Sequence, residues 1–123
     1  MIVADSSYLV EAVLRDARLI DNETIVAPDL VLYEVINALW KHETVIGDLD
    51  DSSSHIDLML ELVSAGSILL VRPDRKLLKE THALSVKNRA PVYDTVFVAL
   101  ALQLSLELKT FDQKQADMLS KER

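Results

Sequence analysis

The segment Ile2-Val3-Ala4-Asp5-Ser6-Ser7-Tyr8-Leu9 decides the fold, because its pattern changes from strand to helix within a few residues. Ile2 to Ala4 is a short apolar run that ends at a polar turn. Beyond that turn, apolar residues from Tyr8 to Val13 recur at helical spacing. The same order of strand, turn and helix returns further along the chain, and it predicts an α/β fold.

The later predicted strands are short apolar runs closed by polar residues or proline. They are Thr24–Ala27, Ser67–Val71 and Leu106–Phe111, with Val92–Tyr93 as at most a very short extended segment. The predicted helices are Leu30–Glu43, Ile56–Val63, Asp74–Lys87, Thr95–Leu104 and Gln113–Leu119. Strands that alternate with helices of this length indicate a parallel sheet with helices packed on its faces. The helix over Thr95–Leu104 is apolar on nearly every side, so we expect it to be buried.

Length and composition narrow the class of protein. With 123 residues, of which 50% are hydrophobic, the chain can form one domain over residues 1–123 with a substantial core. The absence of cysteine excludes disulfides and zinc–thiolate sites. The longest uncharged apolar stretch, Thr95 to Leu106, is much shorter than the roughly 20 residues of a membrane span. No basic leader precedes an apolar run at the N-terminus, so we expect a cytoplasmic protein.

Charge is distributed unevenly. Residues 1–71 carry 13 acids and 3 bases, a balance of −10, whereas residues 72–123 carry 7 acids and 10 bases, a balance of +3. Overall acidity argues against nucleic-acid binding, but the basic stretch in the second half is a candidate phosphate track. A solvated helix face is the alternative interpretation of the same residues. The bases of this stretch are Arg72, Arg75, Lys76, Lys79, Lys87 and Arg89.

Four acidic residues occupy positions where an apolar or neutral residue is expected. Asp5, Asp94 and Asp112 stand at strand or loop ends that lead into helices, and Glu34 lies on the apolar stripe of its own helix. In open α/β sheets, ligands bind beyond the carboxyl ends of the strands. Asp5, Asp94 and Asp112 could also act as helix N-caps, and Glu34 could sit at a solvated stripe edge.

If the four acids gather at one edge of the sheet, they require a cation. Two carboxylates about 5 Å apart repel by roughly 3 kcal/mol at an effective dielectric constant near 20. A set of oxygen ligands favours Mg²⁺ or Mn²⁺, and such ions can support phosphodiester hydrolysis. The sequence therefore predicts Asp5, Glu34, Asp94 and Asp112 as metal-binding and catalytic residues.

The four acidic motifs, in this order, resemble those of the PIN domain family, specifically its VapC-type toxin ribonucleases. The motifs are Ile2-Val3-Ala4-Asp5-Ser6-Ser7, Leu32-Tyr33-Glu34-Val35-Ile36-Asn37-Ala38-Leu39, Tyr93-Asp94-Thr95-Val96-Phe97-Val98-Ala99-Leu100-Ala101 and Thr110-Phe111-Asp112. The resemblance covers nearly the whole chain. It implies a single PIN-like domain with a parallel sheet of about five strands flanked by helices.

The resemblance also implies a function. Members of the family cleave single-stranded RNA with the help of Mg²⁺ or Mn²⁺. They form homodimers, and a small antitoxin protein neutralises them. In that case Asp5, Glu34, Asp94 and Asp112 would hold the metal. The resemblance also places three polar residues around these acids. Ser6 and Thr110 match polar positions near the site, and Asn37 would contact a metal ligand and not the metal itself.

Two other functions compete with this interpretation. A PIN-like fold could act as a non-catalytic module that binds RNA or protein. A phospho-accepting receiver domain has similar length and topology, but it needs an acidic pair after the first strand, an Asp ending the third and a Lys ending the last. Here the third strand ends in Arg72-Pro73 and Lys109 lies inside the last strand.

Overall fold

The protein, described from residue 1 to residue 123 by a computed structural model, is built on one parallel sheet of four strands in the order β3-β2-β1-β4. The strands are β1 (Ile2–Ala4), β2 (Ile25–Pro28), β3 (Ile68–Val71) and β4 (Leu108–Lys109). The helices are α1 (Ser6–Leu14), α2 (Leu30–Lys41), α3 (Ser53–Ser64), α4 (Arg75–Asn88), α5 (Val92–Leu104) and α6 (Gln113–Glu122). Two short helical segments are η1 (Ala17–Ile20) and the π-helical η2 (His42–Ile46). The predicted α/β class is confirmed.

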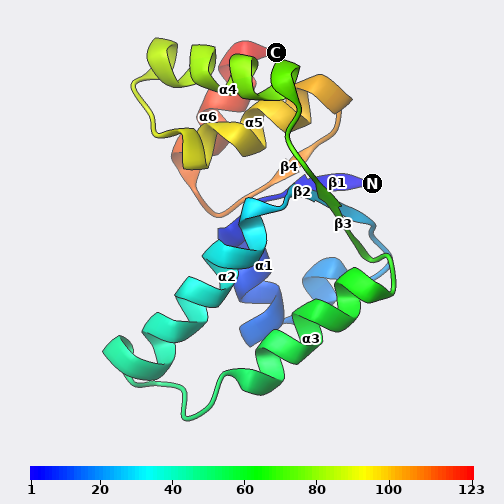
Figure 1. Cartoon of the computed structure of the whole chain (residues 1–123), viewed down its shortest axis with the longest axis vertical. Coiled ribbons are helices and arrows are strands. Elements are labelled where there is room, and N and C mark those ends of the chain that lie inside the picture. The colour runs from blue at the N-terminus through cyan, green and yellow to red at the C-terminus, as the bar shows by residue number, and fades with distance from the viewer.

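The sheet separates two layers of helices. Helices α1, α2 and α3 lie on one side of it, and α4, α5 and α6 lie on the other (Figure 1). Strand β1 is buried along its whole length because it is covered on both faces. Seven consecutive residues of α5, from Thr95 to Ala101, are also buried, which confirms the burial predicted for that helix.

The sheet has four strands where about five were expected. Val92 and Tyr93 form the first turn of α5 instead of an extended segment. The reason lies at Pro91, whose carbonyl oxygen accepts the first hydrogen bonds of the helix, from the N–H groups of Asp94 (3.0 Å) and Thr95 (3.2 Å). Proline is readily accommodated where a helix begins, because no helical partner is lost there.

Strand β4 is much shorter than the predicted Leu106–Phe111. It pairs only with β1, through Val3 with Leu108 and Ala4 with Lys109. Strand β1 ends at Ala4, since Asp5 is already the N-cap of α1. The Asp5 N–H donates the last hydrogen bond between the two chain segments, to the Lys109 carbonyl oxygen (3.2 Å), and beyond Lys109 the chain turns toward α6.

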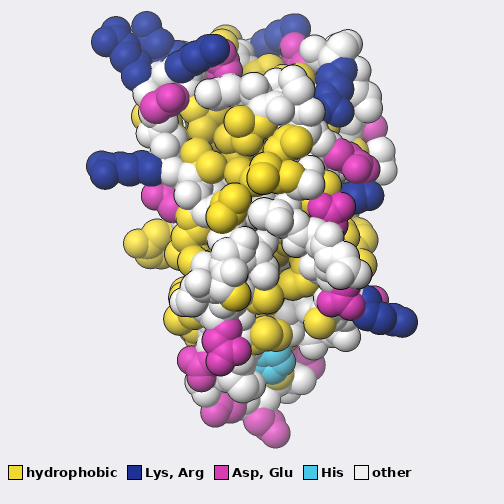
Figure 2. Space-filling model, turned by 90° about the vertical axis from the view of Figure 1, so that its right-hand side faces the viewer, with side chains coloured by type: hydrophobic (Ala, Val, Ile, Leu, Met, Phe, Trp, Pro, Cys, Tyr) yellow, Lys and Arg dark blue, Asp and Glu magenta, His cyan; other side chains and the backbone are white.

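The charge asymmetry of the sequence is also an asymmetry in space. Lysine and arginine side chains gather at the end of the molecule formed by α4, α5 and α6, and acidic side chains dominate the opposite end (Figure 2). The exposed apolar residues Tyr33, Ile36 and Trp40 lie along α2, at 74%, 38% and 51% exposure. No helix combines the length and apolar character needed to cross a membrane.

Candidate active site

The carboxyl ends of the central strands bring the predicted site acids to one edge of the sheet. Asp5 directly follows β1, and Asp112 follows β4 after a two-residue turn. Glu34 lies in the second turn of α2, which begins just beyond β2. Asp94 lies in the first turn of α5. Parallel strands with helices packed on both faces place all four carboxylates around the same edge.

Asp5 is the most constrained of the four. Its side chain is nearly inaccessible, at 1% exposure. Oδ1 accepts hydrogen bonds from the Ser7 hydroxyl (2.7 Å) and the Tyr8 N–H (3.1 Å), and Oδ2 accepts one from the Thr110 hydroxyl (2.6 Å). The N-cap interpretation and the site interpretation of Asp5 therefore both hold, since the same carboxylate caps α1 and lies among the other acids.

Glu34 lies beside the buried stripe of α2 and lacks a partner for one of its oxygens. Its Oε1 is buried and has no hydrogen-bond partner. Burial, together with the charges of Asp94 and Asp5, raises the pKa of Glu34 from 4.5 to about 7, while the Ser6 hydroxyl acts in the opposite direction. Asn37, one turn further along α2, is exposed.

Asp94 does not cap its helix, because Pro91 occupies the N-cap position and Thr95 is buried in the core. The Asp94 carboxylate is half-buried, and burial together with the charges of Asp112 and Asp5 raises its pKa, against the opposing effect of Lys114. Asp112 does cap α6, accepting a hydrogen bond from the Lys114 N–H (3.0 Å). Its own N–H donates to Thr110 Oγ1 (2.9 Å).

These electrostatic effects connect the four acids into one group. Asp5 acts on Glu34 and on Asp94, and Asp112 acts on Asp94. They are not, however, arranged as a finished metal site: no three His, Cys, Asp or Glu side chains are placed to hold a metal ion together. The raised pKa values of Glu34 and Asp94 and the unpartnered Glu34 oxygen fit a group of oxygen ligands for a cation.

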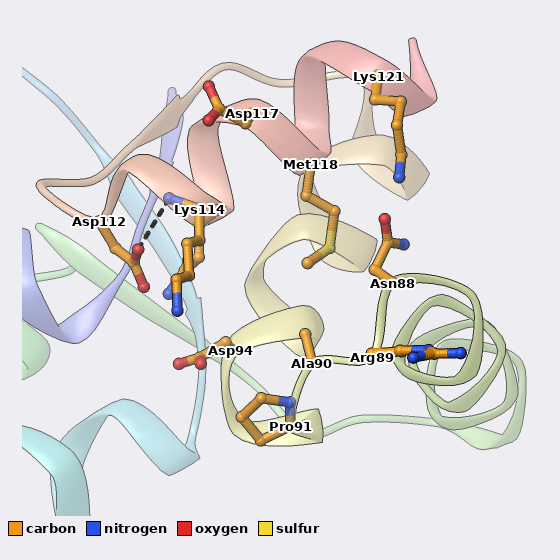
Figure 3. A pocket seen from close by; sticks show the side chains of 11 residues that line it. Asn88, Arg89, Ala90, Pro91, Asp94, Asp112, Lys114, Asp117, Met118 and Lys121 are labelled. Atoms are coloured by element: carbon orange, nitrogen blue, oxygen red, sulfur yellow. Dashed lines mark hydrogen bonds between the residues drawn. The ribbon is translucent and has the colours of Figure 1, made fainter.

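An open groove of about 590 Å³ adjoins Asp94 and Asp112. It lies between α6 and the junction of α4 with α5, and Figure 3 shows the Lys114 and Lys121 side chains reaching into this space. Arg89 and Asn88 form its far side. Both acids that border the groove are thus within a region that also carries positive charge.

The predicted phosphate track is only partly associated with this edge. All six of its bases are exposed on or beside α4. Arg89 lines the groove that contains Asp94, whereas Lys76 pairs with Glu80 (4.0 Å) and Lys87 pairs with Glu122 (3.0 Å). Arg72, Arg75 and Lys79 do not line the groove. The six bases therefore do not form one continuous path to the acids.

Sequence reasoning missed three residues of this region. Ser7 donates to Asp5, and the Phe111 N–H donates in turn to Ser7 Oγ (3.0 Å), while the predicted Ser6 acts on Glu34. The spacing of two adjacent serines after a strand gives no basis for choosing between them. The signal for Lys114 and Lys121 is their spacing of seven residues, which places both on one face of the terminal helix, but this spacing does not indicate that the face borders Asp94 and Asp112.

Comparison with known proteins assigns the family. The PIN domain matches residues 2–119. Ribonuclease VapC3 of Pyrobaculum aerophilum is 36% identical over 90 residues, which cover 72% of this chain and 66% of that relative. The crystal structure of PAE2754 from Pyrobaculum aerophilum has a TM-score of 0.76 at 23% identity, over 95% of this chain and 83% of the other, and shows the same fold. This chain belongs to the PIN domain family.

Proposed function

We propose that this protein is a metal-dependent endoribonuclease that hydrolyses phosphodiester bonds of single-stranded RNA, and that it serves as the toxin of a toxin–antitoxin pair. The observation that carries the proposal is the unpartnered, buried Glu34 Oε1 beside Asp94 and Asp5 at the ligand edge of the sheet. A buried carboxylate without a partner is costly unless a cation or proton meets it. The likeness to a protein named a ribonuclease supports the same activity.

The residues available fit Mg²⁺ or Mn²⁺. Asp5, Glu34, Asp94 and Asp112 offer only oxygen ligands, the class that these hard cations prefer. When bound there, such an ion would activate water and stabilise the negative charge that develops on the phosphate. Ser6 and Asn37 would contact the ligands or their waters, as the family pattern suggests, and Thr110 would hold Asp5 in place.

The chain's own residues prepare the site for this chemistry. Ser7 and Thr110 fix both oxygens of Asp5, so its lone pairs point in defined directions. Glu34 is half-buried and its Oε1 has no partner within the chain, so this oxygen is available to the cation. Lys114 places a positive charge close to Asp94, where a phosphate would approach.

The same proposal includes partners and location. We propose a cytoplasmic homodimer that a small antitoxin protein blocks by inserting a basic side chain among the carboxylates. Exposed Tyr33, Ile36 and Trp40 on α2 support a protein contact, because large apolar side chains are seldom exposed together without one. Light scattering of the purified protein tests the dimer. A complex that resists high salt would contradict insertion of a charged group into the site.

The deciding experiment is cleavage of a labelled single-stranded RNA with Mg²⁺, with Mn²⁺ or with EDTA. We expect cleavage that requires the cation and is lost in Asp94→Asn, while Asp57→Asn, an exposed change of equal charge on α3, cleaves like the wild type. Cleavage that survives Asp94→Asn would contradict the proposal. Metal binding by calorimetry without any cleavage would favour the non-catalytic PIN-like module. Rapid labelling by a small phosphodonor would favour the receiver domain.

A further inference from the structure

We propose that the groove between α6 and the α4–α5 junction is the subsite for the RNA strand adjoining the cleaved phosphate, and that Lys114, Lys121 and Arg89 bind its phosphates. The inference rests on the proposed function and adds to it the path of the substrate. The groove begins at Asp94 and Asp112, so a strand lying in it has one phosphate at the acids. A strand on the outer face of α4 would not.

The positive charges of the groove are available to a ligand. Lys114, Lys121 and Arg89 form no ion pair, while two of the bases on α4 outside the groove, Lys76 and Lys87, are already paired with glutamates. The Lys114 and Lys121 side chains reach into the groove from positions two turns apart on the same face of α6 (Figure 3). Residues seven apart on a helix lie about 10 Å apart along its axis. Because lysine side chains are long, two lysines at this separation can each bind one of two neighbouring phosphates.

Gln115 provides an independent observation in the same groove. It lines the groove and is only 4% exposed, yet its Oε1 has no hydrogen-bond partner. A buried carboxamide oxygen without a partner is uncommon in a folded protein. Reorienting this carboxamide toward the groove breaks no bond to its oxygen, and it would then accept a hydrogen bond from a ribose hydroxyl or a base amino group of the strand.

Arg89 has a strained backbone conformation, and its side chain makes no contact that stabilises the fold. Its φ of 51° and ψ of 48° lie in the left-handed region, where a helix usually ends in glycine. The exposed guanidinium makes no hydrogen bond or ion pair within the chain. Asn22 and Ser105 share this conformation, but Arg89 alone among the three lines the groove, where its guanidinium is free to bind a phosphate.

The test is binding of a fluorescent single-stranded RNA oligonucleotide in EDTA, followed by anisotropy at several salt concentrations. We expect Lys114→Gln and Lys121→Gln each to weaken binding several-fold and to reduce the slope of log K against log salt by about 0.7. The matched control is Lys79→Gln, which removes the same charge from an exposed, unpaired lysine on α4 outside the groove. Equal losses in all three variants would overturn the subsite.

Arg89→Gly separates binding from folding. Glycine relieves the left-handed backbone, so we expect the variant to be at least as stable as the wild type in urea while it binds RNA more weakly. Unchanged RNA binding would overturn the role of Arg89.

The variant Gln115→Met removes the hydrogen-bond acceptor and keeps a side chain of similar size. A loss of preference for RNA over DNA assigns the hydrogen bond to the ribose, and an equal loss of affinity for both assigns it to a base.

Binding and cleavage fail independently in this design. Oligonucleotide binding that depends on Lys114 and Lys121, with no cleavage in Mg²⁺ or Mn²⁺, supports the groove and contradicts the nuclease. Cleavage with cation, combined with identical binding by the groove and control variants, supports the nuclease and contradicts the groove.

Discussion

The Thr110 hydroxyl donates a 2.6 Å hydrogen bond to Oδ2 of Asp5, and so joins the ends of β4 and β1 across 105 positions of sequence. The same Thr110 oxygen accepts a hydrogen bond from the Asp112 N–H at 2.9 Å. One hydroxyl thus ties two of the four acids to each other. Their relative position depends on this contact as well as on the sheet.

Thr110→Val is expected to lower the free energy of unfolding by about 1–3 kcal/mol, because it leaves the buried Asp5 oxygen and the Asp112 N–H without this partner. Urea unfolding measures the change. Thr110→Ser keeps the hydroxyl and is expected to stay close to the wild type. Equal loss in the serine variant would show that the methyl group, not the hydrogen bond, matters at this position.

Stability without metal is expected to fall as the pH rises. The pKa of Glu34 is about 7 in the folded chain and has its ordinary value of 4.5 when unfolded, so the folded state binds the proton more tightly between these values. The stabilisation is complete below pH 4.5 and is lost as the pH rises through about 7. The raised pKa of Asp94 acts in the same direction.

Glu34→Gln checks this assignment. In EDTA at pH 8 we expect it to raise the free energy of unfolding by about 2 kcal/mol, less than the full shift implies because solvent screens a half-buried group. It should also flatten the pH dependence between 4.5 and 7. Asp57→Asn, an exposed change of charge on α3, should leave the pH profile as it is. A wild-type profile in Glu34→Gln would contradict the assignment.

Mg²⁺ or Mn²⁺ is expected to raise the melting temperature, since an ion bound only to the folded chain stabilises it by about 2.7 kcal/mol at a hundredfold excess over its Kd. The effect should be larger at pH 8 than at pH 6, where protonation of Glu34 competes with the ion. Differential scanning fluorimetry measures both. We expect a much smaller response in Asp94→Asn; an identical response there would place the ion elsewhere.

Ser105→Gly is expected to stabilise the chain by about 0.5 kcal/mol, because Ser105 ends α5 with a φ of 55° and glycine adopts this conformation without strain. Urea unfolding detects a change of this size when the two variants are measured side by side. Ser105→Ala keeps the strain and should bring no gain. A gain from alanine would point to the serine side chain instead of the backbone.

The fold and the position of the acids followed from the sequence, and the finer contacts did not. Strand Ile2–Ala4 and the apolar helix after Pro91 have periodicities that leave few alternatives. Val92–Tyr93, predicted as at most a very short extended segment, begins α5 instead, because a β-branched and an aromatic residue favour strands locally while packing of α5 decides the outcome. Which serine contacts Asp5 depends on side-chain geometry at the first turn of α1, which residue spacing does not encode.

Asp5 belongs to the acidic group and also stabilises the fold, and this combination has an evolutionary consequence. Its carboxylate caps α1, binds the hydroxyls of Ser7 and Thr110, and belongs to the acidic group. Glu34 and Asp94 carry no such structural bonds. A lineage that drifts toward inactivity can therefore replace Glu34 or Asp94 and keep a stable chain, but replacement of Asp5 removes a cap and two buried contacts at once. Descendants that have lost the activity should still retain an acceptor side chain at this position.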